Sequence, residues 1–213
     1  FVGNRVGVFA ILAVFAEAEK YKLGFDVVDA LTGSKLGRAK SATFRTCDVV
    51  GLDTLVKVAT DVFDRCPADE SRDTFRLPAF VQQMMERKWL GDKTKQGFYK
   101  KIKNEKGESV ILSLNLQTLE YGEQKKSKFA TLEATKAIDS LTQRMPMLYN
   151  GSDKAGEFYK KAFAGLFAYV SNRIPEISSV LHSVDAAMRA GFGWQLGPFE
   201  VWDTIGLAKG AED

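Results

Sequence analysis

Cysteine and histidine are scarce in this sequence of 213 residues, which holds two cysteines and one histidine. Two cysteines, Cys47 and Cys66, cannot build the disulfide framework typical of small secreted proteins, and their spacing matches no metal site. We therefore expect reduced thiols, a cytoplasmic protein and no bound metal.

A long hydrophobic run is also missing. The apolar stretch near the start, residues 6–16, is shorter than the roughly 20 residues that a membrane span needs. It carries neither the basic leader nor the cleavage site of a signal peptide. We expect no membrane span. The chain starts with phenylalanine rather than methionine, so we also expect that a preceding segment was removed.

Charge of one sign is not in excess, because the net charge is only +3. Hydrophobic residues make up 45% of the sequence and charged residues 27%. This balance is that of an ordinary soluble globular protein and gives no argument for nucleic-acid binding. We interpret the lysine clusters as solvated turns; they comprise Lys100, Lys101, Lys103, Lys106, Lys125, Lys126 and Lys128.

Internal repetition is present instead, and it organises the chain. The opening Phe-Val-Gly-Asn-Arg-Val recurs as Tyr-Val-Ser-Asn-Arg-Ile at 169–174. Val28-Asp29-Ala30 recurs at 184–186, and Asp48-Val-Val-Gly-Leu52 recurs as Asp203-Thr-Ile-Gly-Leu207. The offsets are 168, 156 and 155 residues. The chain therefore contains two related units.

The hydrophobic periodicity predicts that both units are helical. The pattern predicts helices over 6–22, 27–31, 44–50, 55–63, 79–88, 132–144, 154–170, 176–189 and 199–205, and short strands over 98–102, 109–114 and 118–121. The predicted fold is all-α, with two related helical units joined by a small β-containing linker. The predicted domains are 1–102, a linker with short strands and a helix at 103–150, and a truncated second unit at 151–213.

Four motifs follow one another along the chain. They are Phe1-Val-Gly-Asn-Arg5, the loop and helix 36–52 ending in Asp-x-x-Gly-Leu, Lys93-Thr-Lys-Gln-Gly-Phe-Tyr99, and Leu196-Gly-Pro-Phe-Glu200 followed by Asp203 to Leu207. In this order they resemble the C-terminal helical domain of 3-hydroxyacyl-CoA dehydrogenases. Two such units joined by a linker look like the multifunctional fatty-acid oxidation proteins, in which one chain also carries an enoyl-CoA hydratase domain.

The resemblance implies hydride transfer between NAD and carbon 3 of an acyl-CoA. That reaction needs a general base, usually an oriented histidine, and a dinucleotide site with a Gly-x-Gly-x-x-Gly turn. The sequence has no such turn. We therefore expect NAD to be bound by a Rossmann domain that is missing upstream of Phe1, and we expect the isolated chain to be inactive.

Asn4 is the catalytic residue that the resemblance carries over, as a hydrogen-bonding partner of the substrate oxygen. The alternative is that Asn4 only caps the first helix. We interpret its counterpart Asn172 as a structural cap or polar core residue. Lys40, Ser41 and Thr43 are candidate substrate-binding residues lining the acyl or pantetheine channel, and the alternative is a plain surface loop.

Other polar residues have structural interpretations. We expect Arg5 and Arg173 to be buried and to bridge helices. We expect His182 to lie on a helix face rather than to act as a base. Asp48 and Asp203 precede Gly-Leu, where capping and hydrogen bonding between helices are the default roles.

The sequence thus predicts the substrate-binding and dimerisation part of an NAD-dependent 3-hydroxyacyl-CoA dehydrogenase. Its expected partners are an acyl-CoA substrate, the upstream Rossmann domain, a hydratase domain in the same full-length chain and further copies in a homo-oligomer. One alternative is a non-catalytic helical assembly module, and another is a two-domain dehydrogenase acting on a small hydroxy acid. A Rossmann fingerprint before Phe1 would favour the enzyme over the module.

Overall fold

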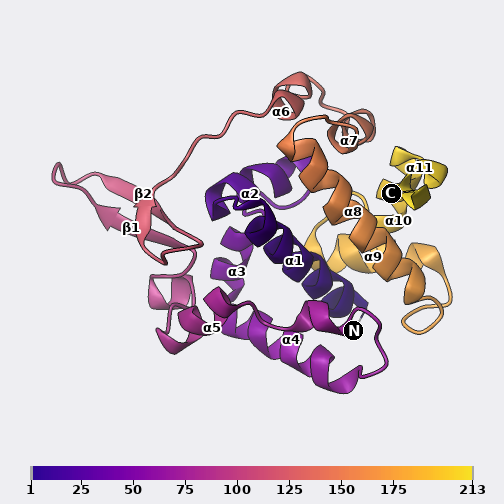
Figure 1. Cartoon of the computed structure of the whole chain (residues 1–213), viewed down its shortest axis with the longest axis horizontal. Helices are drawn as coiled ribbons and strands as arrows, with labels where there is room; N and C mark the ends of the chain where they lie inside the picture. The colour runs from indigo at the N-terminus through magenta and orange to yellow at the C-terminus, as the bar shows by residue number, and fades with distance from the viewer. Residues whose placement is uncertain (1, 213) are drawn as a thin grey trace. The chain divides into compact units, whose positions relative to one another are not determined.

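The computed structural model describes residues 2–212, which are mostly helical with a small antiparallel sheet (Figure 1). This confirms the predicted fold class. The helices are α1 (Val2–Tyr21), α2 (Phe25–Thr32), α3 (Phe44–Val50), α4 (Leu52–Arg65), α5 (Ala79–Glu86), α6 (Ala130–Ala134), α7 (Leu141–Tyr149), α8 (Lys154–Asn172), α9 (Leu181–Phe192), α10 (Pro198–Ile205) and α11 (Leu207–Glu212). Short 3-10 helices are η1 (Ser34–Leu36), η2 (Arg72–Phe75) and η3 (Asp92–Thr94). Across residues 2–212, no helix is both long and apolar enough to cross a membrane.

The contacts divide the chain into two compact units that interleave along the sequence. Within the described residues, one unit comprises 2–17, 33–40 and 128–212, and we call it the all-helical unit. The other comprises 18–32 and 41–127, and we call it the β-containing unit. The division predicted from the repeat, 1–102, 103–150 and 151–213, does not follow these contacts and stays a prediction about the repeated sequences.

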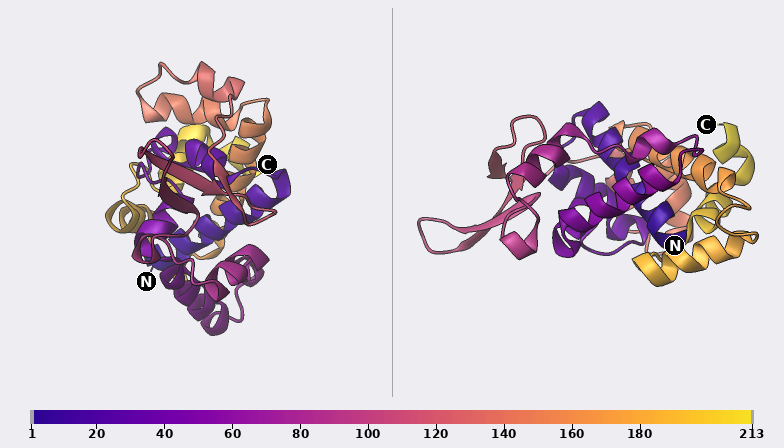
Figure 2. Two further views of the ribbon diagram at one scale, coloured as in Figure 1. Left: turned by 90° about the vertical axis from the view of Figure 1, so that its left-hand side faces the viewer. Right: turned by 90° about the horizontal axis from the view of Figure 1, so that it is seen from below.

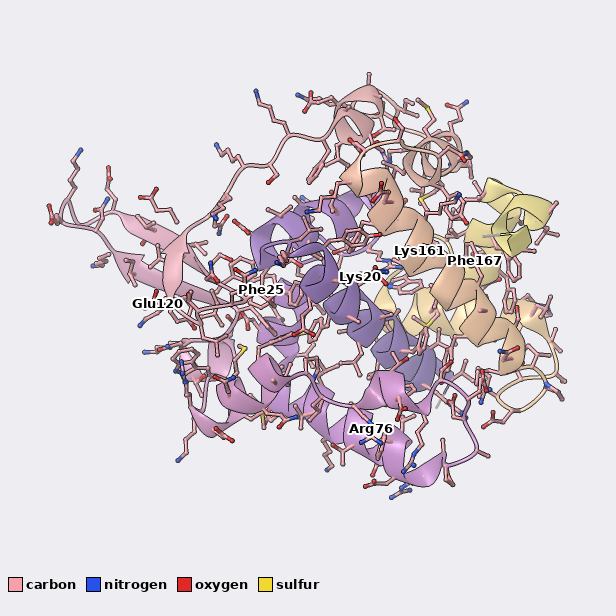
Figure 3. The ribbon with its side chains drawn as sticks, viewed as in Figure 1. Lys20, Phe25, Arg76, Glu120, Lys161 and Phe167 are labelled. Atoms are coloured by element: carbon pink, nitrogen blue, oxygen red, sulfur yellow. The ribbon has the colours of Figure 1, made fainter. Side chains whose placement is uncertain are left out.

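A cluster of phenylalanine rings forms the core of the β-containing unit. Phe25 of α2, labelled in Figure 3, contacts three other rings of this cluster. Its ring centroid is 4.4 Å from that of Phe44, 5.5 Å from Phe80 and 4.8 Å from Phe98. Each of these rings is buried. Helices α2, α3 and α5 and the segment that enters the sheet are therefore held by one aromatic core.

The sheet of this unit has the strand order β1 (Tyr99–Lys103), β2 (Ser109–Leu114), β3 (Tyr121–Glu123), all antiparallel. The β1–β2 hairpin extends away from the helices of its unit (Figures 1 and 2). The first two strands match the prediction within one residue, but the third does not. Asn115 Oδ1 accepts the backbone N–H groups of Gln117 and Thr118, so a turn occupies the predicted start of that strand.

In the all-helical unit, α8 lies alongside α1 (Figure 1). The rings of Phe9 and Tyr169 stack with centroids 3.7 Å apart, and the Tyr169 hydroxyl accepts a hydrogen bond from Arg5 Nε at 3.0 Å. A Cβ atom at Gly7 would lie 2.1 Å from the ring of Phe192 on α9. Gly7 therefore lets this ring pack directly on the backbone of α1.

The helix predicted over 132–144 is wrong in its extent. Two shorter helices, α6 and α7, stand there, and a turn separates them. Pro146 lies inside α7 rather than beyond its end. It is the sixth residue of a nine-residue helix, so its missing N–H removes a single hydrogen bond within the helix. Asn150 donates both its backbone N–H and its Nδ2 to the Pro146 carbonyl, which closes the last turn.

The helix predicted over 176–189 is also displaced, because α9 begins at Leu181. Ser178 explains part of the delay. Its Oγ donates to the carbonyl of Val180 at 2.9 Å and accepts the N–H of the same residue at 3.1 Å. A serine that bonds its neighbouring backbone competes with helix formation.

Candidate functional site

Asp29 fixes the start of α3 and thereby the end of the candidate loop. Its carboxylate accepts the backbone N–H groups of Thr43, Phe44 and Arg45 at 3.0, 2.7 and 2.9 Å. The Tyr99 hydroxyl donates to the same carboxylate at 2.8 Å. Burial raises the pKa of Asp29 to about 6, and the hydrogen bonds from Phe44 and Tyr99 oppose this rise.

Asp48 holds the segment with the Lys-Thr-x-x-Gly-Phe-Tyr signature. Its carboxylate, 1% exposed, accepts the N–H of Phe98 at 2.8 Å and that of Tyr99 at 2.9 Å. A Cβ atom at Gly97 would lie 2.0 Å from Asp48 Oδ1, so only glycine leaves room for the carboxylate there. Burial raises the pKa of Asp48 to about 6, against the two N–H donors.

Tyr99 is thus bound at both ends, by Asp48 at its backbone and by Asp29 at its hydroxyl. Cys47 lies buried beside these two carboxylates, and burial raises the pKa of its thiol well above the usual value. A buried, protonated thiol is a poor nucleophile. Because backbone donors already bind both carboxylates, this cluster positions the signature segment rather than acting as an acid or base.

The same corner occurs twice, which gives the sequence repeat a structural basis. Asp185, the counterpart of Asp29, accepts the N–H of Phe199 at the start of α10 at 2.9 Å. Gly51 and Gly206 follow the two copies with nearly the same backbone angles, φ 101° and ψ 124° against φ 110° and ψ 119°. Both take positive φ, which glycine adopts readily. The two copies differ in burial, because Asp48 is buried whereas its counterpart Asp203 is exposed.

The two repeated arginines meet at one carboxylate. Arg5 Nη1 donates to Glu176, and Arg173 Nη1 donates to the other oxygen of Glu176 at 2.8 Å. Both arginines are buried. The predicted burial of both arginines is confirmed, and Arg5 bridges α1 and α8 through its hydrogen bond to Tyr169.

Asn4 is exposed on the first turn of α1. The helix was predicted to begin at Val6, but residues from Val2 onward are helical, so Asn4 does not have the non-helical backbone of an N-cap. Phe1 of the same motif lies outside the described residues. Asn172, its counterpart, is the last residue of α8 and so occupies the opposite end of a helix.

The structure places the loop candidates differently from one another. Lys40 is exposed and belongs to the all-helical unit, whereas Ser41 and Thr43 belong to the β-containing unit. Ser41 Oγ lies 2.8 Å from the hydroxyl of Thr46. The Thr43 hydroxyl is buried and donates to Thr32 at 2.8 Å. Thr43 therefore anchors the loop from its buried side, whereas Lys40 is exposed and Ser41 is half-buried.

His182 is exposed on α9, as predicted for a helix-face histidine. Among residues 2–212, no group of histidine, cysteine and carboxylate side chains could hold a metal ion. Each of the carboxylates of Asp29 and Asp48 binds several backbone N–H groups, and we call these two arrangements clamps. Sequence reasoning missed both clamps. The repeated Val-Asp-Ala motif and the glycine before Phe98 were the available signals for them.

The C-terminal domain model of 3-hydroxyacyl-CoA dehydrogenases matches residues 1–101 and 170–212 of the chain. A Bacillus subtilis protein described as a probable 3-hydroxyacyl-CoA dehydrogenase is 42% identical over 212 residues, covering 100% of this chain and 26% of the relative. A Deinococcus radiodurans protein of the same description is 49% identical over 106 residues, covering 50% of this chain and 30% of the relative.

A Rickettsia felis protein described as a putative fatty acid oxidation complex trifunctional enzyme is 24% identical over 202 residues. The alignment covers 94% of this chain and 26% of that protein. The chain therefore spans about a quarter of the length of the Bacillus and Rickettsia relatives.

Proposed function

Because the chain belongs to the family of 3-hydroxyacyl-CoA dehydrogenase C-terminal domains, we propose that it is the substrate-binding and dimerisation part of a longer NAD-dependent enzyme of fatty-acid β-oxidation. The reaction is hydride transfer between NAD and carbon 3 of an acyl-CoA. The description of the Rickettsia relative as trifunctional supports the proposal that the longer chain is multifunctional. We further propose that this chain carries a hydratase domain and lies in the cytoplasm.

The residues of this chain do not fit a dinucleotide site. Such a site needs parallel strands and a glycine-rich turn between a strand and a helix. The sheet described here is antiparallel, and the sequence has no Gly-x-Gly-x-x-Gly. We therefore assign NAD and the general base to a Rossmann domain that precedes Phe1 in the longer protein.

Asn4 is the residue of this chain to which we assign a part in the reaction. The observation that carries the assignment is its position, exposed on the first turn of α1 within the family motif. Its amide can donate a hydrogen bond to the substrate oxygen as negative charge develops there. Lys40 and Ser41 supply charge and a hydroxyl for the acyl-CoA, and Thr43 holds the loop in place from its buried side.

The test compares kcat/KM for 3-ketoacyl-CoA reduction by the full-length protein and its Asn4→Ala variant, with the melting temperature as a control. Loss of one such donor costs about 3 kcal/mol, on the order of a hundredfold in rate. Asn172→Ala is the matched control, because it removes the same side chain from the second copy of the motif. Its kcat/KM should stay within about threefold of wild type.

A hundredfold loss confined to Asn4→Ala, with an unchanged melting temperature, supports the proposal. If Asn4→Ala keeps wild-type kcat/KM, Asn4 takes no part in the reaction. The interpretation of the chain as a non-catalytic assembly module then gains support. On its own the 213-residue chain should not oxidise NADH with a 3-ketoacyl-CoA, and detectable turnover would contradict the assignment of NAD to another domain.

A further inference from the structure

Arg38 lies in the loop after η1, and this loop contacts the loop that follows α9. Gly37 has φ 64°, a left-handed conformation suited to glycine, and its carbonyl accepts the N–H of Gln195 at 2.8 Å. This bond joins the two loops within the all-helical unit. It places the Arg38 guanidinium carbon 4.0 Å from the centroid of the Trp194 ring and 6.0 Å from that of Phe163 on α8.

Among the described residues, Arg38 has these two aromatic contacts but no hydrogen bond or ion pair from its guanidinium. The group offers five N–H donors, and a guanidinium that has lost water is normally paired with a carboxylate. Burial lowers the pKa of Arg38 to about 10, so the group has lost much of its hydration but stays protonated at neutral pH. By comparison, the two buried arginines of this unit, Arg5 and Arg173, are both paired with Glu176.

The surroundings add positive charge. Arg144 donates to the backbone carbonyls of Lys35 at 2.9 Å and Ile138 at 2.8 Å, so neutral acceptors satisfy it. Burial raises the pKa of Tyr159, and the positive charges of Arg144 and Arg38 both oppose that rise. Asp153 also acts on Tyr159, but Thr131 and the first turn of α8 already bind its carboxylate.

From this geometry we propose that Arg38 binds an oxyanion, the phosphate or carboxylate group of a small ligand. The buried rings of Trp194 and Phe163 lie against the guanidinium and restrict its movement. Arg38 itself is half-buried, so one side of the group stays accessible. A fixed guanidinium plane presents two parallel donors, the arrangement that matches phosphate and carboxylate oxygens. This proposal does not depend on the dehydrogenase function.

Tryptophan fluorescence tests the proposal, because Trp194 lies directly under the guanidinium. The chain is titrated with sodium phosphate and, in a second arm, with sodium acetate, both at constant ionic strength held with sodium chloride. We expect a saturable change in emission and a rise in melting temperature with ligand concentration. The arm that saturates identifies the class of oxyanion.

Arg38→Gln should weaken this binding at least tenfold. Arg38→Lys keeps the charge but loses the planar fork, so it should bind more weakly than wild type and more tightly than Arg38→Gln. The matched control is Arg189→Gln, since Arg189 is already paired with Glu200, and it should bind like wild type. Arg38→Lys also serves if Arg38→Gln does not fold.

Two results would overturn the proposal. One is a wild-type chain whose emission and melting temperature respond to phosphate and acetate no more than to chloride. The other is equal affinity in wild type and in the folded Arg38 variant. In either case Arg38 would only fasten its loop to the Trp194 ring.

Discussion

Removing the carboxylate of Asp48 tests the clamp on the signature segment. In Asp48→Ala the N–H groups of Phe98 and Tyr99 lose their acceptor in a buried place. Each unpaired N–H costs about 1–3 kcal/mol, partly offset because a charge no longer has to be buried. We expect a net loss of about 2–3 kcal/mol, which for a chain of this length lowers the melting temperature by roughly 4–12 °C.

The matched control is Asp203→Ala, which makes the same change at the exposed counterpart. It should alter the free energy of unfolding by less than about 0.5 kcal/mol. Circular dichroism gives the melting temperatures, and hydrogen exchange reports the amides of Phe98 and Tyr99, which should lose protection in Asp48→Ala. Equal melting shifts for the two variants, or amides that stay protected without Asp48, would refute the clamp.

Three further predictions concern the stability of the chain. With their pKa values raised to about 6, Asp29 and Asp48 keep protons in the native chain that the unfolded chain releases near pH 4. Their contribution to the free energy of unfolding is therefore lost as pH rises from about 4 to 6. In urea denaturation, Asp48→Ala should lower the free energy of unfolding more at pH 5 than at pH 7.5. A larger effect at pH 7.5 would contradict the direction of the pKa shift. Gly97→Ala forces a Cβ against the Asp48 carboxylate and should cost about 1–3 kcal/mol in urea denaturation, whereas Gly122→Ala, which has nothing within 4 Å, should cost far less. Gly165 is an exposed position of α8 where an added Cβ meets open space, so Gly165→Ala should raise the free energy of unfolding by about 0.5–1 kcal/mol. A fall in melting temperature would contradict this prediction.

The sequence predicted correctly those helices and strands whose bounds depend on residues within the segment itself. The helix at 44–50 was predicted with its exact bounds because its apolar spacing and the Gly51 stop lie within the segment itself. The hairpin strands followed from β-branched residues around a turn. By contrast, the helix predicted over 132–144 ended too early because Pro146, just beyond it, was interpreted as a stop, whereas this proline lies inside α7 and removes only a single hydrogen bond there.

The candidate site was predicted only in part, for a different physical reason. The family motif pointed to Asn4, and the structure places this residue exposed on a helix. The clamps were out of reach because their partners lie 14 to 16 residues away for the Asp29 backbone bonds and 50 or 51 residues away for those of Asp48. Pairing over such distances depends on how the chain folds back, which no periodicity in a short window records.

The unequal covering of the two repeated corners has an evolutionary consequence. A substitution at position 48 alters the room and the hydrogen bonds available to residues 97–99, so the two places can change only together. Position 203 has no such partner among the described residues and is free to drift. Among relatives, residues 48 and 97 should therefore covary, while residue 203 should accept side chains of many kinds, although both aspartates began as copies of one motif.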